Sequence, residues 1–150
     1  MVLSADPLGV LQERLGHRFK DRNLLLRALT HVSYAHEHPP ELDNESLAFL
    51  GDAVLSLIVT EHLWDTAPDE PVGVLTPRRA AVVAGDSLAR WAEGLELGPL
   101  LRLGRGEELT GGREKKSVLA TAVEALLGAI YLEDGLGAAR AVVERLSAVW

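Results

Sequence analysis

Three acidic residues stand within or beside apolar helical patterns and are the first candidates for chemistry. Asp52 lies in the apolar stretch 44–64, and Glu124 lies in a second apolar stretch, 117–132. Glu45 precedes Asp52 by seven residues, which places both on one helical face two turns apart. Burying a carboxylate is costly unless a cation or hydrogen bonds compensate. A bound metal ion is therefore one reason for acids at these positions.

A purely structural interpretation of the same acids stays open. Asp52 and Glu124 could instead accept bonds from a nearby Arg, Lys or backbone amide, and Glu45 could stabilise the positive end of a helix dipole. The chain has no cysteine, which excludes disulfides, thiolate zinc sites and cysteine nucleophiles. Any metal must therefore bind oxygen or imidazole.

Two further patterns are weaker. His31, His36 and His38 could be read as a zinc cluster, but their spacing is that of a proline-containing loop, so we do not expect zinc there. The glycine-rich stretch 104–112 lacks the Gly-Lys-Ser/Thr ending of a nucleotide-binding P-loop. We therefore expect no ATP or GTP binding.

Length and composition favour one ordinary globular domain spanning residues 1–150. The chain is 47% hydrophobic, and its apolar stretches are interrupted by Gly, Asp or Glu before the roughly 18 residues that a membrane span needs. No basic start followed by an apolar segment indicates a secretory signal. We expect a cytoplasmic protein with no membrane partner.

The charge balance bears on nucleic-acid binding. A formal charge of -7 argues against a broad basic face, because affinity for phosphates comes mainly from Lys and Arg. A local basic edge remains at Arg113, Lys115 and Lys116, which is either an RNA contact or a solvated loop.

The apolar periodicity predicts helices throughout, because Val and Ile fall in 3.6-residue stripes and not in alternating runs. We predict an all-α fold with about seven to nine helices. The expected helices are a short one from Leu8 to Leu15, 23–30 with Asp21 as its N-cap, 44–64, 78–93, a short 99–103, 117–132, and, after Gly135 ends that segment, a last one to Trp150, with loops at 34–43 and 104–112.

Residues 44–55 carry a recognisable motif, Asn-Glu-Ser-Leu-Ala-Phe-Leu-Gly-Asp-Ala-Val-Leu. It resembles the ribonuclease III signature, Asn-Glu-Arg-Leu-Glu-Phe-Leu-Gly-Asp-Ala-Val-Leu. Further matches follow in the family's order, and the resemblance covers the chain from about Leu8 to its end. These matches are Thr30-His31-Val32-Ser33-Tyr34-Ala35, Leu75-Thr76 with Arg79-Ala80, Gly104 to Glu108 with Gly111-Gly112-Arg113, and Val123 to Leu132.

The resemblance implies a helical, dimeric endonuclease that uses magnesium or manganese to cut double-stranded RNA into products with 5′-phosphates and two-nucleotide 3′ overhangs. In the family, Phe49's counterpart plugs a socket in the partner subunit; an ordinary core phenylalanine is the alternative. Gly51 and Gly128 each cost a helix about 1 kcal/mol relative to Ala, which suggests close helix contact and would suit a homodimer interface. We expect no double-stranded RNA-binding domain within the chain.

The sequence departs from the family where the resemblance places metal ligands. Asp52 and Glu124 match and Glu45 matches a supporting residue, but Ala48 stands where the family has Glu and Thr121 where it has Asp. Val72 also replaces a further acid. We therefore expect weak or absent metal binding and a crippled or inactive dimer that binds RNA or a ribonucleoprotein. The alternative is an active ribosomal-RNA or other RNA-processing enzyme, or an engineered active-site mutant of one.

Overall fold

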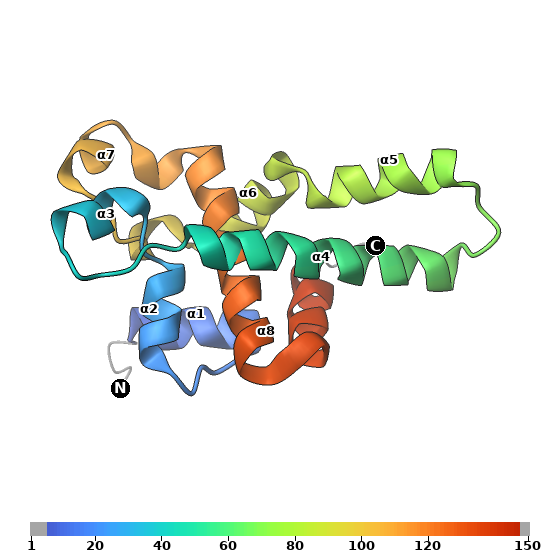
Figure 1. Cartoon of the computed structure of the whole chain (residues 1–150), viewed down its shortest axis with the longest axis horizontal. Helices are drawn as coiled ribbons and strands as arrows, with labels where there is room; N and C mark the ends of the chain where they lie inside the picture. The colour runs from blue at the N-terminus through green and yellow to red at the C-terminus, as the bar shows by residue number, and fades with distance from the viewer. Residues whose placement is uncertain (1–5, 148–150) are drawn as a thin grey trace, which may run out of the picture.

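The computed structural model describes residues 6–147, which form an all-α domain (Figure 1). Within that range the only β-structure is an isolated bridge between Thr30 and Arg102. The predicted all-α class is confirmed, with eight α-helices among the described residues. The helices are α1 Pro7–Leu15, α2 Arg22–Ala28, α3 Val32–Glu37, α4 Glu45–Thr66, α5 Val72–Val83, α6 Gly85–Gly94, α7 Arg105–Leu109 and α8 Lys116–Ser147, with short 3-10 turns η1 Gly98–Leu100 and η2 Gly112–Glu114.

The two apolar helices α4 and α8 cross at the centre of the domain and form its most extensive helix contact (Figure 1). Two glycines make this crossing possible. A Cβ at Gly51 would collide with the backbone carbonyl of Glu124, and one at Gly128 would collide with the carbonyl of Leu47. The expected close helix contact therefore exists, but it lies within one chain. Gly51 is buried there, so its assignment to a dimer interface is corrected.

A methyl group at this crossing should be poorly tolerated. We expect Gly51→Ala to lower the free energy of unfolding by about 3 kcal/mol, because backbone and not a flexible side chain occupies the space. Gly137→Ala is the matched control, since nothing lies within 4 Å of its Cβ position. That variant should gain roughly 0.5–1 kcal/mol. Urea denaturation of both variants measures the difference, and equal stabilities would contradict the tight crossing.

Three helical segments differ from the sequence prediction. Helix α3 extends to Glu37 and so occupies the first part, 34–37, of the expected loop 34–43, because the ring of His31 accepts a hydrogen bond from the Ser33 amide and caps the helix. Helix α5 begins at Val72 and carries Pro77 in its second turn, and the extended backbone of Ala84 separates it from α6. The third, α7, lies inside the expected loop 104–112.

Other predicted boundaries are confirmed. Asp21 caps α2 by accepting from the amides of Asn23 and Leu24. Gly135 interrupts α8 with a positive φ of 85°, a conformation that favours glycine. The last predicted helix continues from this kink through the described residues, and its end at 148–150 lies outside them.

By length and composition alone, α4 is apolar enough to cross a membrane, which the sequence analysis did not anticipate. Its most apolar 18-residue window has a mean hydropathy of 1.4, and 39% of that window is buried inside the domain. The same pattern is typical of the core helix of a globular protein, and one face of α4 indeed packs on α8. Phe49, Leu57 and Trp64 remain exposed on it.

Candidate functional site

A cavity of about 590 Å³ lies where the first half of α4 meets the start of α8. It brings together the retained acids Glu45, Asp52 and Glu124 with the two positions where the resemblance leads us to expect further acids. The lining residues are His31, Asn44, Glu45, Ala48, Phe49, Asp52, Ser117, Val118, Thr121 and Glu124. The sequence motif thus corresponds to one physical site.

The position of α4 at this cavity is set by Asn44, which precedes the helix and is 3% exposed. Its backbone amide donates to the carbonyl of Thr30 at 2.9 Å, and its side-chain amide donates to the carbonyl of Ala28 at 3.0 Å. Its Oδ1 is buried without a protein partner. Asn44 therefore ties the start of α4 to the end of α2. Asn44 is part of the sequence motif, but only the structure shows that it anchors the helix.

Asp52 and Glu124 form the chemical centre of the cavity. The close crossing at Gly51 brings the two helices together, and Asp52 lies near enough to Glu124 to affect its ionisation. Burial raises the pKa of Glu124 to about 7, and the hydrogen bond and negative charge of Asp52 add to that effect. Glu124 thus holds a proton up to near-neutral pH. A divalent cation would compensate the same repulsion, which is why a metal suits this position.

This raised pKa predicts a pH-dependent stability. Between pH 4.5 and 7 the folded chain holds a proton at Glu124 that the unfolded chain releases, so its contribution declines as the pH rises through this window. In EDTA, Glu124→Gln should therefore be more stable than the parent at pH 8, by about 1–3 kcal/mol after allowance for partial exposure. At pH 4 the two should be nearly equal. Urea denaturation at both pH values measures this, and a difference independent of pH would refute it.

The other two expected ligand positions offer no charge. Ala48 is 7% exposed and has no side-chain oxygen. The Thr121 hydroxyl donates to the carbonyl of Ser117 at 2.8 Å. Glu45 lines the cavity, but its carboxylate is too far from those of Asp52 and Glu124 for all three to bind one ion. Among residues 6–147, the only three potential ligand atoms that lie within 4.8 Å of one another belong to a different group. Asp52 and Glu124 are therefore the two carboxylates of the candidate metal-binding centre.

This donor set fits a single hydrated magnesium or manganese ion. Magnesium in proteins is commonly held by one or two carboxylates while it keeps several waters, and Asp52 and Glu124 supply those two. A bound ion would supply Lewis-acid stabilisation of phosphate charge. Two ions need more carboxylate oxygens than this pair provides, so the residues present do not fit a two-metal centre.

The basic residues predicted to contact RNA are largely engaged within the domain. Arg113 pairs with Glu108 and donates to the carbonyls of Gly98, Pro99 and Leu101, the last at 2.6 Å. These bonds hold the η2 turn against the η1 turn.

The two lysines make ion pairs of different exposure. Lys115 pairs with Glu107 at 2.5 Å and lowers the pKa of that carboxyl. Lys116 pairs with Asp86 at 3.2 Å, with both side chains 70% exposed. Exposed pairs of this kind are weak, so Lys116 is the most available of the three predicted contacts for a phosphate. RNA contact by all three stays a prediction.

Phe49 lies at the rim of the cavity and is 83% exposed. The alternative of an ordinary core phenylalanine is therefore wrong for a single chain. A large apolar side chain so exposed beside an apolar helix face is typical of a residue that a partner covers. Its contact with a second copy stays a prediction.

The histidines do not form the zinc cluster that their proximity in sequence suggested. His31 uses Nδ1 to contact Ser33, while its Nε2 lies 3.8 Å from Glu107. The ring of His38 stacks on Tyr34. Within residues 6–147, the group with metal-ligand geometry is instead His17, Glu133 and Asp134, which the sequence analysis missed.

Comparisons with known proteins agree with the sequence motif and the fold. A family model described as ribonuclease-III-like matches residues 21–148. Ribonuclease 3 of Streptomyces coelicolor is 54% identical over 137 residues, which are 91% of this chain and 49% of that protein. Ribonuclease 3 of Caldanaerobacter subterraneus is 50% identical over 137 residues, 91% of this chain and 60% of that one. The chain thus spans about half to three-fifths of the length of these relatives.

A solved structure gives the same result for the fold. The nuclease domain of ribonuclease III from Campylobacter jejuni superposes with a TM-score of 0.87 at 42% identity, covering 95% of this chain and 94% of that one. A second structure of that domain, described as flexible in a region involved in dimer formation, matches with the same TM-score over 93% of this chain.

Proposed function

The chain belongs to the ribonuclease III family, and we propose that it binds double-stranded RNA, alone or in a ribonucleoprotein, as a cytoplasmic homodimer that cuts RNA very slowly or not at all. One observation supports the loss of activity above all others. The cavity that holds Asp52 and Glu124 also holds Ala48 and Thr121, so the two absent carboxylates are absent from the chemical centre itself.

The expected chemistry explains why this matters. Hydrolysis of a phosphodiester requires a nucleophilic water and stabilisation of the leaving oxygen, and two divalent ions commonly share these tasks. Here Asp52 and Glu124 can orient one hydrated ion, and the proton on Glu124 near neutral pH competes with that ion. Weak occupancy and a missing second ion both lower the rate.

Cleavage of double-stranded RNA by an active endonuclease is the second candidate function. It is favoured by the retained contact between Asp52 and Glu124 and by Glu45, which lines the same cavity. If Glu45 moved inward during RNA binding, the centre would gain a third carboxylate. Magnesium or manganese would then be a required cofactor.

Equilibrium binding measurements show whether the chain has kept its affinity for RNA or has lost it together with its activity. The full chain is titrated into labelled 30-base-pair RNA in EDTA at low salt, with a single strand and a DNA duplex of the same sequence as controls. We expect preferential binding to duplex RNA that weakens as salt is raised, because Lys and Arg side chains that neutralise phosphates displace bound counterions. The dependence on salt should be shallow, because this acidic chain can neutralise few phosphates. Equal binding to all three nucleic acids, or to none of them, would overturn the proposed RNA-binding role.

A charge reversal on the surface locates the contact. Lys116→Glu, at the start of α8, should weaken duplex binding, while Lys20→Glu, in the loop between α1 and α2 that meets α8 at Asp134, should leave it unchanged. Equal effects of the two substitutions would indicate that the net charge of the chain, and not a defined surface, determines RNA binding.

A further inference from the structure

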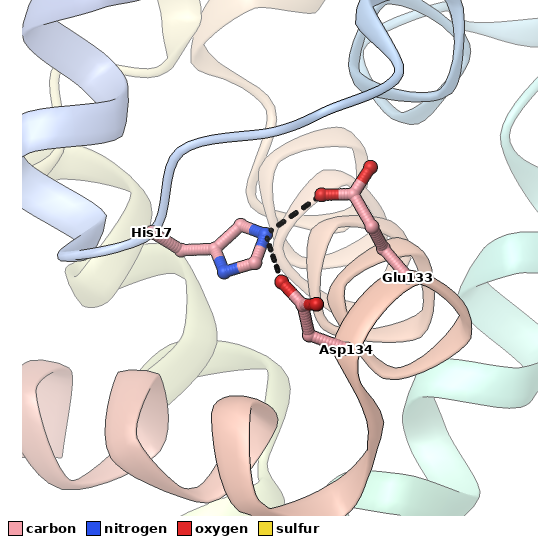
Figure 2. Close-up of side chains that lie close together, drawn as sticks. All are labelled: His17, Glu133 and Asp134. Atoms are coloured by element: carbon pink, nitrogen blue, oxygen red, sulfur yellow. Dashed lines mark hydrogen bonds and ion pairs between the residues drawn. The ribbon is translucent and has the colours of Figure 1, made fainter.

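A second cluster of metal-ligating side chains lies away from the cavity, where the loop after α1 meets the kink of α8 (Figure 2). His17 comes from the loop, and Glu133 and Asp134 come from the last turn before Gly135. The Nε2 atom of His17 lies 3.1 Å from Oε1 of Glu133 and 3.6 Å from Oδ2 of Asp134. Figure 2 shows this nitrogen directed between the two carboxylates.

We propose that His17, Glu133 and Asp134 bind a divalent transition-metal ion, with zinc as the best fit, independently of the site at Asp52 and Glu124. Zinc bound to nitrogen and oxygen at its usual distances and in tetrahedral geometry separates its ligand atoms by roughly 3.4 Å. The two measured separations bracket that value, and all three ligand atoms lie within 4.8 Å of one another. A water completes the fourth position.

The ligands are held in place before any ion binds. Both oxygens of Glu133 accept backbone hydrogen bonds at 2.9 Å, Oε1 from Lys20 and Oε2 from Asp21. The ring of Phe19 meets the His17 ring edge-on, with centroids 4.9 Å apart. Such supporting contacts fix ligand orientation in metal sites and raise affinity. The cluster therefore needs little rearrangement to accept an ion.

Burial and charge also suit a cation. The side chains of His17 and Glu133 are 8% and 7% exposed, while Asp134, at 30%, leaves an open side for entry. Burial alone would raise the pKa of Glu133, but the amides of Asp21 and Lys20, with His17, hold it below its ordinary value. Glu133 is thus ionised, as a metal ligand must be.

Lys20 is the group that opposes binding. Its ammonium lies 2.9 Å from Oδ1 of Asp134, the oxygen that faces away from His17. The proposed ion uses Oδ2, so Lys20 can remain in place while repelling it. Removing the charge of Lys20 should therefore strengthen metal binding. If the cluster served only as a network of ion pairs, the same substitution would weaken it.

The test uses the full chain with Asp52→Asn, which disables the other carboxylate centre, stripped of metal with EDTA. Zinc chloride is titrated by calorimetry and thermal unfolding, and cobalt chloride by visible absorption. We expect one ion per chain, a cobalt spectrum of tetrahedral type, and a rise in Tm of roughly 5–10 °C at a zinc concentration about 100 times the Kd. No saturable binding to this chain would overturn the proposal.

Ligand variants identify the site. In the same background, His17→Gln should abolish binding, and the exposed His36→Gln should retain it. Asp134→Asn, which keeps the side-chain shape, decides the question if circular dichroism shows that His17→Gln does not fold. Lys20→Gln should lower the zinc Kd roughly three- to ten-fold. Undiminished binding in folded His17→Gln or Asp134→Asn, or weaker binding in Lys20→Gln, would contradict this site.

Discussion

Ala48→Glu combined with Thr121→Asp should raise the rate of duplex RNA cleavage by about 10²–10⁴-fold, if each restored carboxylate recovers the ten- to hundred-fold that loss of a supporting metal-site group costs. Both positions line the 590 Å³ cavity, which has room for longer side chains. Each restored acid shares a helical face with a retained acid, Asp52 on α4 or Glu124 on α8. The measurement is cleavage of long duplex RNA in magnesium, with the protein in excess.

Two controls test whether the recovered cleavage comes from the restored carboxylates. Each single restoration should recover less than the double variant, because both added acids serve one centre. Adding Asp52→Asn to the double variant should abolish the recovered activity. A folded double variant that binds duplex RNA without cutting it would show that more than the missing ligands separates this chain from an active nuclease.

Phe49→Ser should raise the dissociation constant of the predicted homodimer by at least about 10²-fold, because truncating a central aromatic residue of an interface costs 2 kcal/mol or more and a two-fold interface contains it twice. Phe49 is 83% exposed in the single chain, so the substitution removes no core packing and the monomer should stay folded. Sedimentation velocity across nanomolar to micromolar concentrations measures the change.

Leu109→Ser is the matched control for that experiment. Leu109 is 80% exposed on α7, so it tests whether any exposed apolar side chain contributes equally to self-association. Its dimer should be as stable as the parent's. A parent chain that sediments as a monomer at micromolar concentration would refute the dimer, and equal weakening by both substitutions would refute the specific role of Phe49.

The parts of the fold that the sequence predicted well depend on local patterns. The apolar stripes of α4 and α8 are long enough to identify both helices. The family resemblance matched Asp52 and Glu124 to ligand positions, and the structure places both on one cavity. Helix α7 was missed because neighbours outside it stabilise its start. The Gly104 amide donates to the Ser33 hydroxyl, and the Arg105 amide donates to Glu37.

Three other differences have a similar cause. Glycines in apolar helices indicate close approach, but they do not say whether the neighbour is the same chain or another one, and Gly51 proved to face Glu124 of its own chain. His17 and Glu133 are separated by 116 positions, so no spacing rule could join them. Arg113 looked like a free basic residue because its carbonyl partners carry no sequence signature.

Single-turnover cleavage by the unmodified chain tests the central claim, that Asp52 and Glu124 alone are too few carboxylates for phosphodiester hydrolysis. Protein in large excess over long, end-labelled duplex RNA is incubated with magnesium or manganese, and the ends of any products are mapped. We predict intact RNA, with the double restoration Ala48→Glu and Thr121→Asp cutting the same substrate. Metal-dependent products with 5′-phosphates and two-nucleotide 3′ overhangs, made by the unmodified chain at a rate near that of the restored one, would contradict it.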